Sequence, residues 1–213
     1  MNWKETAAAA MAACVILGAA PGLSAQAAAP AATPAAAQSA ADASGQVPQT
    51  LAAYAQDELS RLASSPAIEQ YIQALNTRRV RLADLRALDA EWQAAPGVEW
   101  YMWNLMRNPL AWELVDFQYQ HKFVMEAFAM DVHGAIVAET NRTSSFYKGE
   151  ADKFTSAYAN GAGALWYGPP GFDESTAEMV IQVSVPVMKG SRAIGVVCFS
   201  ISLDRWEDRR LDK

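Results

Sequence analysis

Apolar residues recur with a helical period in the first patterned part of the chain. In residues 48–63 the spacing predicts one amphipathic helix, whose apolar stripe is formed by Leu51, Tyr54, Leu59 and Leu62. Residues 65–76 restart the pattern, with Ser65 able to cap a helix that has Pro66 at its first position, where no N–H is needed. The stripe of this second helix consists of Ile68, Tyr71, Ile72 and Leu75. Long helices therefore open the predicted fold.

Two further helical segments follow these. Pro96–Gly97 ends a third helix, in residues 81–92, whose apolar stripe is Leu82, Leu85, Leu88 and Trp92. Asn108–Pro109 marks a turn before a short helix in residues 109–122. This region is dense in aromatic residues, which we interpret mainly as core, with the lining of a pocket as the alternative: Trp100, Tyr101, Trp103, Trp112, Phe117 and Tyr119.

After Phe123 the period changes from helical to strand-like. Residues 125–130 and 135–140 flank Asp131–Gly134, which has the Asp and Gly positions of a type I turn, so they predict a hairpin. Three more strands are predicted at residues 163–168, 179–187 and 193–203. The order of these segments favours an α+β domain in which long N-terminal helices pack on a five-stranded antiparallel sheet.

The strand predicted at residues 179–187 alternates in a way that assigns its two faces. One face is apolar and consists of Ile181, Val183, Val185 and Val187. The other face is mixed and consists of Val180, Gln182, Ser184 and Pro186. Because an antiparallel sheet needs only one dry face, we expect the apolar face to pack on the long N-terminal helix. The mixed face is expected to lie under loops formed by residues 140–160 and 166–178.

The first part of the chain has a composition of its own. Residues 1–25 combine an early lysine, an apolar run over residues 7–20 and small residues after it, which is the pattern of a secretory signal peptide. A membrane anchor is the alternative, which the shortness of the run disfavours. Residues 26–47 are rich in Ala and Pro and lack a periodic apolar pattern, which predicts a disordered linker. Residues 48–213 are left as one domain, expected in the periplasm.

Charge and cysteine content exclude several classes of function. The formal net charge of −6 argues against nucleic acid as a partner. Removal of the signal peptide would leave Cys198 as the one cysteine, which excludes an intramolecular disulfide and a cysteine zinc cluster. The apolar residues around Cys198 predict that it is a buried small side chain.

The sequence contains no motif for catalysis. The chain has 2 histidines, His121 and His133, and it lacks the nucleophile-elbow, zinc-protease and phosphate-loop motifs. We therefore expect no enzyme activity, no cofactor and no metal site. A weak hydrolase or metal-dependent enzyme that uses His121, His133 or Asp173 is the alternative.

Several segments together resemble the extracytoplasmic Cache, or PDC, sensor domains, PAS-like modules of which this chain would be a single-Cache type. The segments are "SPAIEQYIQALN", "LDAEW", "FAMDVHGAIVAETNRTSSFYKGEADKF", "FDES" and "IQVSVPVMKGSRAIGVV". The resemblance implies a PAS-like sheet with a long helix on one face and a small molecule bound on the other, under a loop. Such domains often carry an acidic residue, a tyrosine and "GDE" after "TS". This chain has Ser145, Phe146 and Gly149–Ala151 there, so a carboxylate for a cationic ligand is missing.

The candidate ligand-binding residues are those expected around such a pocket: Thr143, Tyr147, Trp166, Asp173, Gln182 and Ser184. Thr143 belongs to a hydroxyl-rich stretch, residues 140–145, which suits hydrogen bonds to a polar ligand. Capping of a helix in residues 147–158, or tying of the loop itself, is the alternative role for this stretch. Asp173 lies in a Pro/Gly loop and suits either an amine or an Asx turn. Trp166 suits either a pocket wall or the core.

The sequence thus predicts a periplasmic small-molecule-binding sensory protein without a fused output module, since little chain follows the last strand. The expected ligand is a small polar molecule: an amino acid, a carboxylate or an amine. A separate membrane signalling partner would receive the signal, and the resemblance allows a homodimer. The alternative is a Cache-fold structural or interaction protein with a degenerate pocket.

Overall fold

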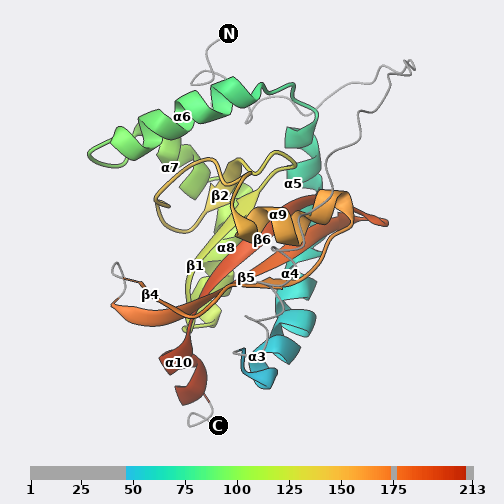
Figure 1. Ribbon diagram of the computed structural model, residues 1–213, viewed down its shortest axis with the longest axis vertical. Coiled ribbons are helices and arrows are strands. Elements are labelled where there is room, and N and C mark those ends of the chain that lie inside the picture. Colours follow the sequence, from blue (N-terminus) through green and yellow to red (C-terminus); the bar gives the residue numbers. More distant parts are fainter. Residues whose placement is uncertain (1–46, 174–176, 210–213) are drawn as a thin grey trace.

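The computed structural model describes residues 47–173 and 177–209. The expected signal peptide, residues 1–25, lies outside the described residues, and so does the expected linker up to residue 46. Val47, the last residue of that linker, is buried against the core. The described chain has the predicted α+β fold, with helices around one antiparallel sheet (Figure 1).

Consecutive helical segments form the N-terminal layer: α3 (Gln49–Tyr54), η2 (Ala55–Leu59), α4 (Ser60–Ala63) and α5 (Pro66–Asn76). The helix predicted for residues 48–63 therefore contains a π-helical stretch, η2, in its middle. Pro66 stands at the first position of α5, as predicted. Ser65 makes no capping bond, because its hydroxyl donates instead to the Glu113 carboxylate of another helix at 3.2 Å.

The remaining helices are α6 (Leu82–Ala94), α7 (Trp100–Met106), α8 (Pro109–Gln120), α9 (Asp152–Tyr158), the 3-10 turn η3 (Ala159–Gly161) and α10 (Leu203–Asp208). The predicted helices in residues 81–92 and 109–122 correspond to α6 and α8. The helix expected within residues 147–158 begins only at Asp152, because Tyr147 pairs as a single β-bridge with Ala135.

The described sheet contains β1 (Val124–Met130), β2 (Ile136–Glu139), β3 (Trp166–Tyr167), β4 (Gly171–Asp173), β5 (Glu178–Lys189) and β6 (Arg192–Ser202). The strand order is β2-β1-β6-β5-β3, with β4 paired to β5 beside this path, and every pairing is antiparallel. The five predicted strands are present, although β3 is short. The Pro/Gly loop expected to hold Asp173 is partly the strand β4, because its backbone pairs with β5.

The β1–β2 hairpin turns at Asp131–Gly134, as predicted. The N–H of Gly134 donates to the backbone oxygen of Asp131 at 3.0 Å. Gly134 has a φ of 78°, which costs a glycine little because it has no Cβ. The turn therefore uses the two residues that the sequence pattern singled out.

A bulge in β2 changes which side chains share a face of the hairpin. Ala129 pairs with Ala138, but the next residue of β1, Met130, pairs with Ile136, so Val137 is an extra residue. The side-chain amide of Asn108 donates to the backbone oxygen of Val137 at 2.9 Å. The bulge therefore shifts the alternation of side chains along β2 by one residue, so the faces of the residues beyond it differ from those of a regular strand.

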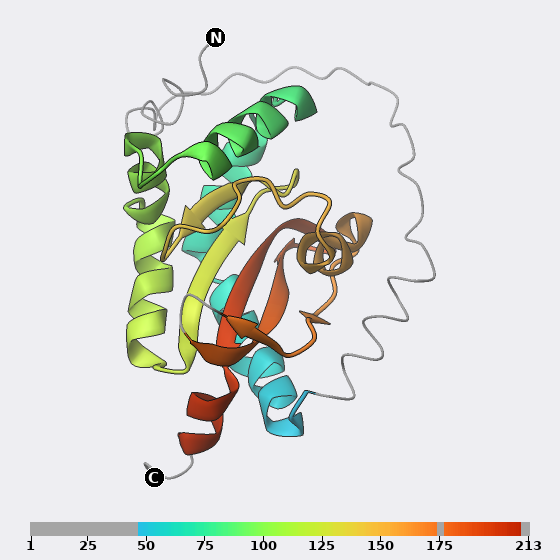
Figure 2. The same cartoon turned by 60° about the vertical axis from the view of Figure 1, so that its left-hand side comes forward.

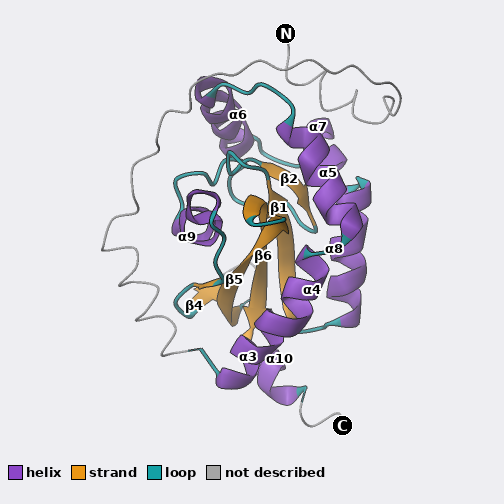
Figure 3. Ribbon diagram, turned by 90° about the vertical axis from the view of Figure 1, so that its right-hand side faces the viewer, coloured by secondary structure: helices purple, strands orange, loops and turns teal. Residues whose placement is uncertain are grey.

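The two faces of the sheet pack on different helices, as Figure 3 shows: α4, α5 and α8 lie along one face and α9 lies on the other. The apolar side chains of β5 and the N-terminal helices belong to one buried cluster, which includes Leu51, Leu59, Ile68, Ile72, Ile181, Val183, Val185 and Val187. The prediction for the apolar face of β5 is confirmed. The opposite face carries a second cluster, around Trp92, Phe128, Phe146, Phe154, Trp166 and Cys198.

The helices α7 and α8 follow one another along one side of the fold in Figure 2. Their aromatic residues belong only partly to the core. Tyr101 and Phe117 are buried, as the core interpretation predicts. The same interpretation is wrong for four rings that are more than two-fifths exposed: Trp100, Trp103, Trp112 and Tyr119. Each of these short helices has only one inward face, so rings on its other faces meet solvent. Within residues 47–173 and 177–209, no helix has the length and apolarity to cross a membrane.

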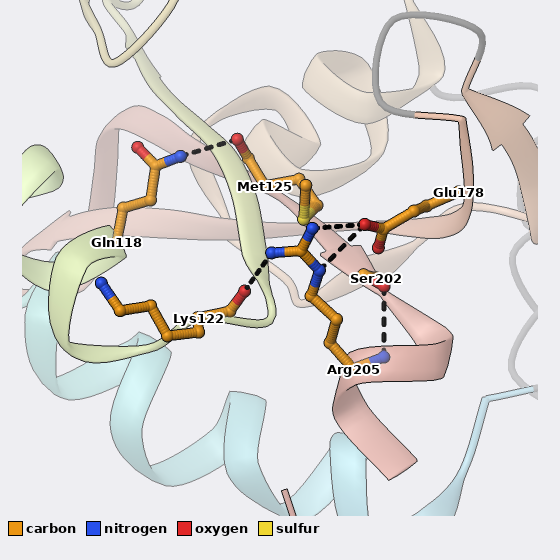
Figure 4. A network of polar contacts seen from close by, with 6 residues as sticks. All are labelled: Gln118, Lys122, Met125, Glu178, Ser202 and Arg205. Atoms are coloured by element: carbon orange, nitrogen blue, oxygen red, sulfur yellow. Dashed lines mark hydrogen bonds and ion pairs between the residues drawn. The ribbon is translucent and has the colours of Figure 1, made fainter. Parts of the chain in front are cut away.

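Arg205 of α10 joins the beginnings of two strands (Figure 4). Its guanidinium donates to Glu178, the first residue of β5, at 2.5 and 2.9 Å, and to the backbone oxygen of Lys122 at 3.3 Å. The Ser202 hydroxyl caps α10 by accepting from the N–H of Arg205. Glu178 is also the pairing partner of Asp173 in β4. The contact of Arg205 with Glu178 therefore links α10 to the paired strands β4 and β5.

Candidate functional site

A cavity of about 690 Å³ opens on the sheet face that α9 shares. Its floor comes from β1 and β5, and its walls come from the loop after β2, from Trp166 of β3 and from the segment around β4. The lining residues are Glu126, Arg142, Thr143, Ser144, Trp166, Gly168, Pro169, Gly171, Phe172, Asp173, Val180 and Gln182. Cavities that hold small molecules in proteins usually have volumes of roughly 300–1,000 Å³, so this one has room for an amino-acid-sized ligand.

Four of the six candidate ligand-binding residues line the cavity: Thr143, Trp166, Asp173 and Gln182. Ser184 does not, because its side chain is fully buried between its pairing partners, Trp166 and Cys198. Tyr147 also lies outside the lining, and its N–H donates to the Asp89 carboxylate at 3.0 Å. The structure thus brings together the residues from three of the predicted segments, and contact with a ligand stays a prediction for each of them.

The hydroxyl-rich stretch after β2 forms one wall of the cavity and is held by its own hydrogen bonds. The Thr140 hydroxyl accepts from the N–H of Ala127 at 3.0 Å, and the Thr143 hydroxyl donates to the backbone oxygen of Ser145 at 2.9 Å. The capping part of the alternative role is wrong, because the residue before α9 is Ala151. The loop-tying part is confirmed, because these side chains fix the shape of the loop with their own hydrogen bonds.

Trp166 forms the opposite wall, next to a glycine that its ring requires. A Cβ atom on Gly168 would lie 3.0 Å from the Cη2 atom of the Trp166 ring. The N–H of Gly168 donates to the backbone oxygen of Gln182 at 2.7 Å, which ties this wall to β5. The sequence prediction offered a pocket wall or the core for Trp166, and the ring serves as both, because it is 8% exposed and lines the cavity.

The floor contains a carboxyl group that sequence reasoning missed. Glu126 of β1 lines the cavity and lies opposite Ser200 of β6, which in turn lies opposite Gln182 of β5. Burial raises the pKa of Glu126 to about 7, against the fields of Lys148 and Lys153, which lower it. Because desolvation disfavours the charged form, Glu126 is poised to change protonation near neutral pH.

A second carboxyl group, Glu139, lies behind the loop wall. It is fully buried, and its Oε2 atom accepts from the N–H of Thr143 at 3.1 Å. Burial, together with the nearby Glu126, raises the pKa of Glu139 to about 8, against the hydrogen bonds from Thr143 and the field of Lys148, which lower it. A glutamate inside an otherwise apolar strand, as in "MEAFAM" and "AIVAET", is the sequence signal that marks both residues.

Lys148 is a buried cation near this site. Its Nζ atom donates to the Ser145 hydroxyl at 2.5 Å, and burial lowers the pKa of its amine, with Lys153 lowering it further. Ser145 is the position at which the resemblance led us to expect an acidic residue. Here its hydroxyl accepts from a lysine, so the site differs from that pattern in its charges as well as in its residues.

The histidines take no part in this site. His133 is exposed in the β1–β2 turn, and the Nδ1 atom of His121 lies 3.0 Å from the Tyr54 hydroxyl at the end of α8. In the part of the chain that the structure describes, no three His, Cys, Asp or Glu side chains gather as they would to hold a metal ion. Cys198 is buried in the apolar cluster, as predicted.

Comparison with known proteins yields matches of structure and none of sequence. No protein-family model matches the chain, and no curated protein matches it. One similar structure is the sensor domain of the histidine kinase DctB from V. cholerae, with 14% identity, a TM-score of 0.41 and coverage of 81% of this chain and 56% of that chain.

Two other similar structures are ligand-binding domains of chemoreceptors. That of CtaA from Pseudomonas fluorescens, in complex with L-valine, has 14% identity, a TM-score of 0.36 and coverage of 75% of this chain and 64% of that chain. That of PctC from Pseudomonas aeruginosa, in complex with GABA, has 14% identity, a TM-score of 0.34 and coverage of 69% and 59%. The chain thus spans less than two thirds of the length of each. All three are sensor or ligand-binding domains of the kind that the sequence resembles.

Proposed function

We propose that this protein is an extracytoplasmic sensory domain that binds a small polar molecule in the cavity between β1, β3, β5 and the loop after β2. The observation that carries this proposal is the cavity itself. It lies on the face of the sheet turned away from the N-terminal helices, and its lining combines an aromatic wall, Trp166, with polar groups at Thr143, Asp173 and Gln182. A concave site that combines an aromatic ring with a few convergent polar groups is typical of ligand-binding domains.

The ligand class that fits this lining is an amino acid or another small amine. Among the described residues, the charged side chains of the lining are those of Glu126, Asp173 and Arg142. The Arg142 guanidinium already donates to the backbone oxygens of Trp92 and Ala95, at 2.8 and 3.0 Å. The lining therefore gives a ligand the Glu126 carboxyl as an acceptor, while the Nη2 atom of Arg142 is held by the end of α6.

Export and signalling complete the proposal. The N-terminal segment, residues 1–25, has the pattern of a cleaved signal peptide, which supports action in the periplasm. A separate membrane protein would then receive the signal. N-terminal sequencing of the protein from the periplasmic fraction checks export, and an N-terminus that retains Met1 would contradict it.

A thermal-shift screen with amino acids, small carboxylates, amines and purines tests ligand binding. Binding to the folded state raises the melting temperature by mass action, so a true ligand produces a shift that grows with its concentration. The variant Gln182→Ala should lose most of this shift, and Gln120→Ala, an exposed change on α8, should keep it. No shift with any compound would contradict the proposal.

The rival function, an interaction protein with an unused cavity, is favoured by one observation. Four large aromatic side chains are exposed to solvent: Trp100, Trp103, Trp112 and Tyr119. Exposed apolar surface of this kind often marks a protein-binding site. A chain that shows no thermal shift but loses a partner when Trp112 is changed to serine would support this rival.

A further inference from the structure

The helix α8 has an apolar stripe on its outer side as well as on its inner side. The inner side packs on β1, β2 and α5, and its buried residues are Leu110, Ala111, Leu114 and Phe117. Trp112, Val115 and Tyr119 are spaced by three and four residues, so they share the other side of the helix, where all three are exposed. A helix that is apolar on two opposite sides is typical of one that packs on two neighbours.

The preceding helix, α7, adds to the exposed apolar surface. Both helices pack on the β1–β2 hairpin and lie one after the other along one side of the fold (Figure 2). Nine large apolar side chains are exposed among the described residues, and six of these belong to residues 98–119. Monomeric proteins usually scatter such side chains singly, so their gathering marks an interaction surface. We name the exposed apolar residues of the two helices the aromatic face: Trp100, Trp103, Trp112, Val115 and Tyr119.

The aromatic face is large enough for a specific protein contact. Its four rings are between 43% and 73% exposed. Since a whole Trp or Tyr side chain has a surface of about 150–250 Å², the rings together offer roughly 300–550 Å². An interface of standard size buries about 800 Å² on each partner, so the rings alone supply about half of that area. Trp and Tyr are also among the residue types that most often dominate the binding energy.

The N-terminal helices offer no comparable surface. Residues 47–76 are described without a gap, and none of their large apolar side chains is exposed. Their apolar stripe, which includes Leu51, Leu59, Ile68 and Ile72, is used up by the contact with the sheet. An apolar contact between two molecules therefore has its place on α7 and α8 and not on the long N-terminal helices.

The charges beside the aromatic face do not oppose contact between two copies. The chain has a formal net charge of −6, so two copies repel one another on average. Around α7 and α8, however, the exposed charged residues include both signs, with Glu99 and Asp116 against Arg107 and Lys122. Two copies can therefore approach one another along this side without bringing together charges of one sign alone.

We propose that the aromatic face is the contact between two copies of this protein, which pair about a two-fold axis with α8 against α8. The spacing of Trp112, Val115 and Tyr119 is that of a seam between two helices. A two-fold axis brings the same seam of a second copy onto it, and two-fold dimers are the commonest protein assemblies. The cavity shares its sheet face with α9, on the side away from α8 (Figure 3), so the contact leaves both cavities open and does not depend on ligand binding.

Sedimentation equilibrium of the purified protein between about 1 and about 100 μM tests the contact, and we expect a dimer. Trp112→Ser and Tyr119→Ser should each weaken dimerisation at least about tenfold, because aromatic side chains at the centre of an interface carry much of its binding energy. Leu82→Ser is the matched control, since it removes an exposed apolar side chain at the start of α6. Gln56→Arg is the second control, on the exposed side of η2. Both controls should dimerise as the parent protein does.

Four results would overturn the dimer contact. The first is a monomer at the highest concentration, even one that binds another protein. The second is a dimer that the double variant of Trp112→Ser and Tyr119→Ser retains. The third is a dimer that only Gln56→Arg dissociates, since the contact would then lie on the N-terminal helices. The fourth is an assembly that grows beyond two copies. Because the changed side chains are exposed, we expect each variant to fold, and circular dichroism melts check this.

Discussion

The indole Nε1 atom of Trp92 donates a hydrogen bond of 2.7 Å to the backbone oxygen of Thr143. The bond joins α6 to the loop that walls the cavity. Arg142, the neighbour of Thr143, returns the contact by donating to the backbone oxygens of Trp92 and Ala95 at the end of the same helix. The loop is thus bonded to α6 through both Trp92 and Arg142, so α6 fixes the position of the loop. It also fixes the Thr143 N–H, which donates to the Glu139 carboxylate.

Replacing Trp92 by phenylalanine should destabilise the protein by about 1–3 kcal/mol, because the Thr143 oxygen would lose its donor inside the core and a smaller ring would leave a void. Urea denaturation measures the change. Trp103→Phe is the matched control, since Trp103 is 43% exposed, and it should alter stability by less than about 0.5 kcal/mol. Equal losses in the two variants would show that the bond to Thr143 does not hold the loop.

The stability of the ligand-free protein should depend on pH through Glu126 and Glu139. Their folded-state pKa values, about 7 and about 8, lie above the ordinary value of 4.5, so the folded state binds more protons than the unfolded state between these limits. The contribution of the pair to the free energy of unfolding therefore falls as pH rises from about 4.5 to about 8. His121, whose pKa burial lowers, has the opposite sign below its ordinary value of 6.5.

Glu139→Gln isolates this effect, because it removes one titrating group and keeps the shape. Melting temperatures taken between pH 5 and pH 9 should fall less steeply in the variant than in the parent protein. Glu207→Gln, on exposed α10, should reproduce the parent curve. Parallel curves for the parent protein and Glu139→Gln would contradict the raised pKa of Glu139.

Gly168→Ala should narrow the cavity and lower stability. The added Cβ atom would meet the Trp166 ring at 3.0 Å, so the ring or the loop must shift, at a cost of about 1–3 kcal/mol. Gly97→Ala is the control, because its Cβ atom would have no other atom within 4 Å and Gly97 lies outside the cavity lining. Chemical denaturation and ligand titration should both distinguish the two variants, and a neutral result for Gly168→Ala would mean that the wall yields easily.

Arg205→Ala should weaken the support of the β4–β5 hairpin. The guanidinium is 48% exposed, so solvent screens its ion pair with Glu178, and the expected loss is about 0.5–1 kcal/mol. Arg81→Ala removes a more exposed pair, with Asp84 at the start of α6, and should cost less than Arg205→Ala. Hydrogen exchange at Phe172 and Asp173 should become faster only in Arg205→Ala. Unchanged exchange at those residues would contradict the role of α10.

The local patterns of the sequence carry much of the fold. Alternation in β5 assigned Ile181 and Val183 to the helix face and Gln182 to the cavity face, and the structure confirms this. The prediction succeeds because the residues of one strand alone decide which of its side chains share a face. The turn at Asp131–Gly134 was equally readable, since its geometry depends on adjacent residues.

The rings of α7 and α8 were less readable. Aromatic residues occur all round these helices, and periodicity does not tell which face meets the sheet. Trp112 is exposed while Phe117 of the same helix is buried, because only the face toward β1 and β2 is covered. The strand β4 was missed for a related reason: its three residues are a strand only through their pairing with β5.

By itself the sequence determined the helices, the hairpin turn and the inward and outward sides of β5, because these follow from neighbours along the chain. Only the tertiary structure decided that Glu126 and Glu139 share a face, since this depends on the register of β1 against β2 and on the bulge at Val137. Alternation counted along β2 would place Ile136 and Glu139 on opposite faces. The extra residue returns both to the same side, so the two carboxyl groups come together only once the strands are paired.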